Sequence, residues 1–187
     1  MRHTLLCLLA VVCLLALAAG AGAQEGSFLT DADAPAAVFP KNTSFERLEF
    51  PVTDAAKAAV AKAMGDAPAS MWEDHWVAFR AHASDTVVGY ALLVEEIGKH
   101  RPIDFVVGLR PDGTVEDVAV MAYREAYGGE IASRRFLAQY RGKGPQAGLR
   151  PYRDVQNVAG ATLSVEAASR AVRKAQAIAA VLGLTHP

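Results

Sequence analysis

Short apolar segments separated by tight turns dominate the middle of the chain, and they restrict the fold more than any other feature. Between residues 76 and 121 the apolar side chains recur with a period of two, which is the spacing of a β-strand. The turn Arg110-Pro111-Asp112-Gly113 separates two of these segments, 103–109 and 114–121. Strands joined by turns this short run antiparallel. The sequence therefore predicts an antiparallel β-meander.

Helical patterns flank this region on both sides. Thr53 is suited to cap a helix over residues 54–64, and Gly65 to end it. A second helix is expected within 131–140. Apolar side chains recur at helical spacing from residue 165 to 182. Ser164 is predicted as the N-cap of this helix and Gly183 as the residue that ends it. The predicted fold class is α+β, an antiparallel β-meander sheet packed with helices in a single domain.

The first 23 residues have the pattern of a secretory signal peptide. An apolar run covers residues 5–19, and Ala21-Gly22-Ala23 matches a cleavage site. Both cysteines, Cys7 and Cys13, lie in this segment, so the mature chain can form no disulfide or cysteine-bound cluster. We expect an exported protein, periplasmic or membrane-associated on the outer side. Residues 24–74 are interpreted as an N-terminal lead-in, flexible up to residue 37, with one short helix. Residues 75–187 are interpreted as the functional domain.

Composition and motifs argue against several classes of function. The chain has 19 basic and 20 acidic residues and lacks a large basic patch, so no nucleic-acid partner is predicted. The arginines between residues 134 and 153 form either a solvated face or a local field for phosphate or an acidic partner. The histidines lack metal-ligand spacing, and neither a Gly-x-Ser-x-Gly elbow nor a P-loop lysine occurs. No metal site and no catalytic residue is therefore predicted.

A loop of small residues precedes the last predicted helix. Residues 158–164 read Val-Ala-Gly-Ala-Thr-Leu-Ser, so Ala159, Gly160 and Ala161 permit close approach to the backbone. Thr162 and Ser164 add hydroxyl groups at the start of a helix, where free N–H groups and the helix dipole favour a phosphate. From the residues alone, an ordinary helix cap is the favoured explanation of the loop.

A resemblance adds to this interpretation. Gly160-Ala161-Thr162, together with Ser164, resembles the attachment motif of the FMN-binding domain family, which includes flavin subunits of sodium-pumping NADH:quinone reductases and ion-translocating ferredoxin:NAD oxidoreductases. In that family the threonine carries FMN through a phosphoester bond, installed by a flavin transferase. The resemblance implies that Thr162 is this residue. Two positions differ, because Gln156 stands where the family often has Asp and Ala159 where it usually has Ser or Thr.

A second segment, residues 123–130, follows a predicted strand and contains adjacent glycines. It is either an ordinary turn or a loop whose backbone faces a ligand. In the family a glutamate and a glycine-containing turn border the flavin ring here, and the similarity extends from about residue 87 to residue 182. The cofactor-binding candidates implied by the resemblance are Thr162, Gly160, Ala161, Ser164, Ala159, Glu125, Tyr127, Gly128, Gly129 and Lys143.

The resemblance implies an exported flavoprotein that carries FMN on Thr162 and transfers electrons. Its partners would be a flavin transferase and a redox partner, for which a membrane electron-transfer complex is one candidate. With no proton-transfer pair evident, an electron carrier is favoured over a self-contained enzyme. Two alternatives stay open: an exported binding or scaffold module of the same fold without flavin, and a flavin-dependent reductase of a small substrate.

Overall fold

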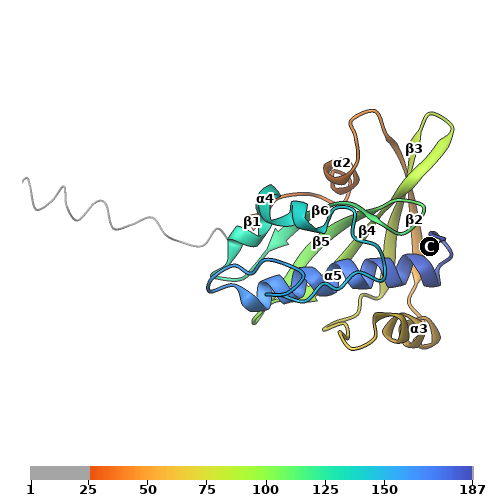
Figure 1. Cartoon of the computed structure of the whole chain (residues 1–187). Coiled ribbons are helices and arrows are strands. Elements are labelled where there is room, and N and C mark those ends of the chain that lie inside the picture. Colours follow the sequence, from red (N-terminus) through yellow and green to blue (C-terminus); the bar gives the residue numbers. More distant parts are fainter. Residues whose placement is uncertain (1–25, 187) are drawn as a thin grey trace, which may run out of the picture.

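The computed structural model describes residues 26–186 and shows one antiparallel sheet with helices on both faces (Figure 1). The predicted signal peptide lies outside the described residues. The six strands have the spatial order β1-β6-β5-β4-β3-β2. This confirms the α+β class and the antiparallel meander. The strands are β1 (Gly26–Ser27), β2 (Ser44–Pro51), β3 (His75–Ala83), β4 (Thr86–Ile97), β5 (Pro102–Leu109) and β6 (Val115–Tyr123).

The N-terminal segment forms part of the sheet instead of a flexible lead-in. Strand β1 pairs with β6 at one edge, and β2 pairs with β3 at the other. Helix α2 (Ala34–Val38) crosses between these edges and buries Ala34 and Val38 completely or nearly so. The apolar segment around Phe45 and Phe50, which lies within the predicted lead-in of residues 24–74, is strand β2.

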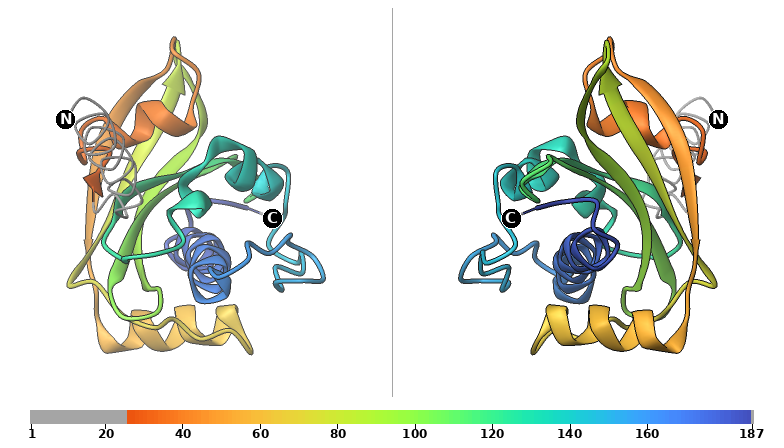
Figure 2. Two further views of the ribbon diagram at one scale, coloured as in Figure 1. Left: turned by 90° about the vertical axis from the view of Figure 1, so that its left-hand side faces the viewer. Right: turned by 90° about the vertical axis from the view of Figure 1, so that its right-hand side faces the viewer.

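Two cores lie on opposite faces of the sheet. In strand β5, Phe105 and Val107 belong to the larger core, whereas Val106 between them belongs to the smaller one. Helix α5 (Thr162–Val181) and helix α3 (Asp54–Met64) cover the larger core, and α2 covers the smaller one. Figure 2 looks along α5 and shows the sheet curving around it, with α3 beneath.

The helix ends test the predicted caps. Thr53 Oγ1 accepts the backbone N–H of Ala56 at 3.2 Å, and α3 ends at Gly65, as predicted. At the end of α5, Leu184 donates to Ala179 O and Gly183 to Ala180 O, which confirms Gly183 as the residue after the cap. The prediction for Ser164 is wrong, because α5 begins at Thr162 and its N-cap is Ala161.

The helix expected within residues 131–140 is broken into short turns. A 3₁₀ turn, η1 (Gly129–Ala132), leads into helix α4 (Arg134–Leu137), which continues as η2 (Ala138–Tyr140). Ser133 caps α4 through its side chain, and Phe136 and Tyr140 are buried in the larger core. This segment closes the sheet face beside α5.

A buried ionic network joins α5 to β4 and to the segment after α3. Lys174 is fully buried, and its ammonium donates to Glu73 Oε1 and Met71 O at 2.8 Å and to Glu95 O at 3.1 Å. The carboxylate of Glu96, also fully buried, accepts from Arg170 Nε at 3.0 Å. Four compensating charges therefore fix the helix on the sheet. Within residues 26–186, no helix combines the length and the apolar character that crossing a membrane requires.

Candidate functional site

A cavity of about 450 Å³ opens at the N-terminal end of α5. Its walls come from three segments that are distant in the sequence: the β4–β5 turn, the loop after β6, and the first residues of α5. The lining residues are Lys99, His100, Glu125, Ala126, Tyr127, Gly160, Ala161, Thr162, Leu163 and Ser164. Pockets for small ligands have volumes of roughly 300–1,000 Å³, so this cavity has a suitable size for one.

Thr162 is the first residue of α5, and its hydroxyl faces two polar side chains. Asn157 Nδ2 donates to Thr162 Oγ1 at 3.0 Å, and Tyr152 Oη lies 3.1 Å from the same oxygen. Thr162 is half-buried, whereas Tyr152 is 75% exposed and lies on the solvent side. The hydroxyl is thus held in place while it remains open to solvent on one side.

The N-terminus of α5 lacks a side-chain cap. The N-cap residue is Ala161, which has no side-chain acceptor to offer. The first N–H groups of a helix have no partner within the helix, and together with the helix dipole they favour an anion. The residues at this end of the cavity therefore fit a phosphate group next to Thr162.

Ser164 has a structural role in the cavity wall. It is buried in the first turn of α5, and its Oγ lies 3.0 Å from the hydroxyl oxygen of Tyr123. Tyr123 also donates to the carbonyl oxygen of Tyr127. Burial raises the pKa of Tyr123, which keeps its hydroxyl protonated as a donor. One buried phenol therefore connects strand β6, the loop after it and helix α5.

Glu125 fixes the opposite wall of the cavity. Its side chain is buried, and Oε1 accepts backbone N–H groups of His100 and, at 2.9 Å, of Arg101. Burial alone would raise the pKa of Glu125, but the backbone N–H groups of His100, Arg101 and Lys99 outweigh it and the pKa is lowered. A Cβ at Gly98 would lie 2.9 Å from Glu125 Oε1, so a larger residue there would displace the Glu125 carboxylate. Glu125 thus anchors the β4–β5 turn at the cavity.

The remaining predicted site residues lie around the cavity but do not line it. Gly128 has φ +87°, and a Cβ there would lie 2.7 Å from Ala161 Cβ, so the loop and α5 meet at this glycine. Gly129 begins η1 beside Tyr123 and does not line the cavity. Ala159 is exposed on the loop before α5. Lys143 lies outside the cavity, where its ammonium donates to Asp154 O at 3.3 Å.

The exposed aromatic side chain at the cavity is Tyr127, with 82% of its surface accessible, and Leu163 beside Thr162 is 44% exposed. These side chains suit a planar ring system that is partly open to solvent.

Lys99 and His100 were not predicted from the sequence. They reach the cavity only because β4 and β5 pair and Glu125 binds their turn. A Gly-Lys-His-Arg turn between two predicted strands was the available signal.

Comparison with known proteins agrees with this geometry. In the described part of the chain, no three His, Cys, Asp or Glu side chains are placed to hold a metal ion. No curated protein matches the sequence. Residues 98–177, which include the β4–β5 turn, the loop after β6 and most of α5, match the family described as the FMN-binding domain. Residues 98–177 are therefore an FMN-binding domain of this family, and FMN is the cofactor.

Proposed function

We propose that this protein carries FMN through a phosphoester bond to Thr162 Oγ1 and serves as an electron carrier on the outer side of the cytoplasmic membrane. The observation that supports attachment is the position of Thr162. Its hydroxyl belongs to the first residue of an uncapped helix and lines the cavity formed by the FMN-binding domain.

The residues around Thr162 have separate tasks in this proposal. Asn157 and Tyr152 orient the hydroxyl, whose proton leaves as the bond to phosphorus forms. A flavin transferase supplies the flavin phosphate in activated form, as a phosphoanhydride; its P–O bond to the second phosphate breaks as the Thr162 oxygen bonds to phosphorus, and that second phosphate leaves. The N–H groups at the start of α5 then stabilise the phosphate charge. Tyr127 offers a flat, exposed surface to the ring. When bound, FMN supplies the capacity to accept and donate electrons, and the protein positions it.

The state of Glu125 is consistent with a carrier, in which this carboxylate has no role in substrate chemistry. This carboxylate is the acidic group in the cavity lining, and its Oε1 is occupied by backbone N–H groups. It is therefore a poor acid or base for substrate chemistry. Covalent attachment keeps the cofactor on the protein wherever free FMN is dilute, since a noncovalent cofactor dissociates by mass action. Export through the predicted signal peptide would place the protein where free FMN is dilute, so covalent attachment would be needed to retain the cofactor.

The two departures from the family motif lie at the surface. Gln156 and Ala159 are both exposed on the loop that leads to Thr162, and neither lines the cavity. They belong to the face that a flavin transferase would contact. Gln156 and Ala159 are therefore expected to change how efficiently FMN is attached and to leave the flavin cavity unchanged.

Intact mass spectrometry of protein co-expressed with a flavin transferase tests the proposal. Wild-type protein should gain the mass of one FMN less one water, and Thr162→Ala should gain none. Thr162→Ser keeps a hydroxyl and should be modified. The same spectrum should show a chain that begins at Gln24. Protein that contains flavin but shows no added mass would establish noncovalent binding and overturn the attachment, while a redox titration without reversible flavin reduction would overturn the carrier role.

A further inference from the structure

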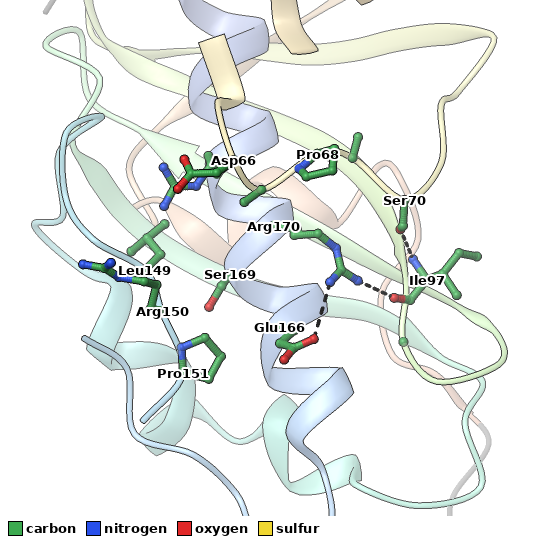
Figure 3. A pocket seen from close by; sticks show the side chains of 14 residues that line it. Asp66, Pro68, Ser70, Ile97, Leu149, Arg150, Pro151, Glu166, Ser169 and Arg170 are labelled. Carbon is green, nitrogen blue, oxygen red and sulfur yellow. Dashed lines mark hydrogen bonds and ion pairs between the residues drawn. The ribbon is translucent and has the colours of Figure 1, made fainter. Parts of the chain in front are cut away.

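A second cavity, of about 550 Å³, lies beside α5 (Figure 3) and, like the Thr162 cavity, borders the β4–β5 turn. Ile97 and Gly98 of this turn line the second cavity, whereas Lys99 and His100 line the first. The further walls are residues 66–70, residues 149–151 and one face of α5. Nothing in the proposed attachment of flavin uses this space.

Apolar groups form much of the second cavity. Ala67, Pro68 and Ala69 contribute from the segment after α3, and Leu149 and Pro151 from the loop on the other side of α5. In Figure 3, Pro68 and Ser70 lie on one side of the helix and Leu149 and Pro151 on the other. An opening of this size with apolar walls accommodates the body of a small organic molecule.

Three arginines surround these apolar walls: Arg150, Arg170 and Arg173. Two of them have partners inside the protein. Arg170 donates to Glu96 Oε2 at 3.0 Å and to Ile97 O at 2.7 Å, and lies 3.9 Å from Glu166 (Figure 3). Arg150 Nε lies 3.3 Å from Asp154 Oδ2.

Arg173 differs from the other two. It is half-buried on α5, and within residues 26–186 it makes no hydrogen bond or ion pair. A guanidinium group at a cavity that makes no hydrogen bond or ion pair within the protein attracts an anion, and its planar donors match a carboxylate or sulfonate. The cavity thus combines apolar walls with three arginines and the carboxylates of Asp66 and Glu166, and Arg173 is the arginine for which the described residues form no ion pair.

We propose that the second cavity binds a small organic anion, with a ring-sized apolar body on residues 67–69, 149 and 151 and one acidic group on Arg173. The apolar walls favour an organic acid over an inorganic anion, which would gain nothing from them. This site is distinct from the flavin cavity and does not depend on flavin attachment. A ligand here would contact the same turn that borders the flavin, through Ile97 and Gly98.

Isothermal titration calorimetry of the mature protein with naphthalene-2-sulfonate tests the proposal. Saturable binding at one site is expected. Arg173→Gln should weaken it about tenfold or more, because one charge-assisted contact is lost, and Arg173→Lys should retain part of the affinity. Arg135→Gln removes an exposed arginine on α4 and should leave the affinity unchanged. Sodium sulfate at equal concentration should not displace the probe.

Two controls show which cavity binds the probe and how much the charge of the probe contributes to its affinity. Tyr127→Ala changes the flavin cavity and should not affect binding of naphthalene-2-sulfonate, and uncharged 2-naphthalenemethanol should bind at least about tenfold more weakly. The proposal is wrong if wild-type protein shows no saturable binding, if Arg173→Gln binds as tightly as wild type, or if Tyr127→Ala alone abolishes binding. None of these outcomes bears on the FMN adduct, which the mass spectrum measures separately.

Discussion

The hydroxyl oxygen of Tyr123 lies 3.0 Å from Ser164 Oγ, and this contact joins the end of strand β6 to the first turn of helix α5. Because the same hydroxyl donates to Tyr127 O, the two walls of the flavin cavity are fixed relative to each other by one buried side chain. The position of Thr162, two residues before Ser164, depends on this contact.

Tyr123→Phe should therefore destabilise the fold. The substitution keeps the ring but leaves Ser164 Oγ and Tyr127 O without the hydroxyl. A buried polar group without a partner costs about 1–3 kcal/mol, which urea unfolding would measure. Tyr152→Phe is the matched control, because its hydroxyl is exposed, and it should change the free energy of unfolding by less than about 0.5 kcal/mol. Equal effects of the two variants would contradict the role of Tyr123.

The carboxylate of Glu125 should make stability depend on pH. Its pKa in the folded protein lies below the ordinary value of 4.5, because backbone N–H groups outweigh burial. Its stabilising contribution is therefore present above about pH 4.5 and is lost as pH falls through the folded-state pKa. Glu125→Gln should lower the free energy of unfolding at pH 7, and the difference from wild type should shrink in acid.

Urea titrations from pH 3 to pH 7, with Glu130→Gln as an exposed neighbouring control, measure this difference. A gap between wild type and Glu125→Gln that stays constant with pH would show that the backbone contacts do not stabilise the carboxylate.

Lys174→Met should be severely destabilising. The substitution leaves the Glu73 carboxylate, which is 13% exposed, without its fully buried ammonium partner, and breaking a buried ion pair in this way costs about 3–5 kcal/mol. Adding Glu73→Gln should recover part of the loss, because the uncompensated charge is removed. Lys62→Met changes an exposed lysine on α3 and should have little effect. If the double variant were no more stable than Lys174→Met, the charge explanation would fail.

Gln156→Asp should increase the fraction of protein that carries FMN. The aspartate restores the family residue on the exposed loop ahead of Thr162. We expect a rise of severalfold at limiting transferase, measured as the ratio of modified to unmodified intact mass, with Gln156→Asn as the uncharged control. An unchanged ratio would remove Gln156 from the recognition surface.

The meander could be predicted from the sequence because its signals are local. The Asp112–Gly113 turn and the alternating residues around it specify a hairpin without help from the rest of the chain. Strand β2 lacks such a signal. Phe45 packs against the smaller core, and Leu48 and Phe50 against the larger one, so its apolar residues do not lie on one face. Pairing with β3 decides its structure.

In the site, too, residues with a local sequence signal could be predicted, and residues placed by long-range contacts could not. Thr162, Gly160 and Ala161 could be identified from a short motif, and the structure brings them together with Glu125 and Tyr127. Ser164 was misassigned as a cap because its partner, Tyr123, is 41 residues away in sequence. Lys143 was proposed by its place in the family pattern, but the loop after η2 directs it toward Asp154.

Because of the spatial order of the strands, the N-terminal residues cover the edges of the rest of the sheet. Strands β1 and β2, which come first in the chain, cover β6 and β3 at the two opposite edges. A fragment that begins after Pro51 would present unpaired N–H and C=O groups along both edges, which are templates for pairing with other chains. A fragment limited to residues 98–177 would also lack β3, β4 and α3. Autonomous folding thus requires far more of the polypeptide than the segment that defines the family.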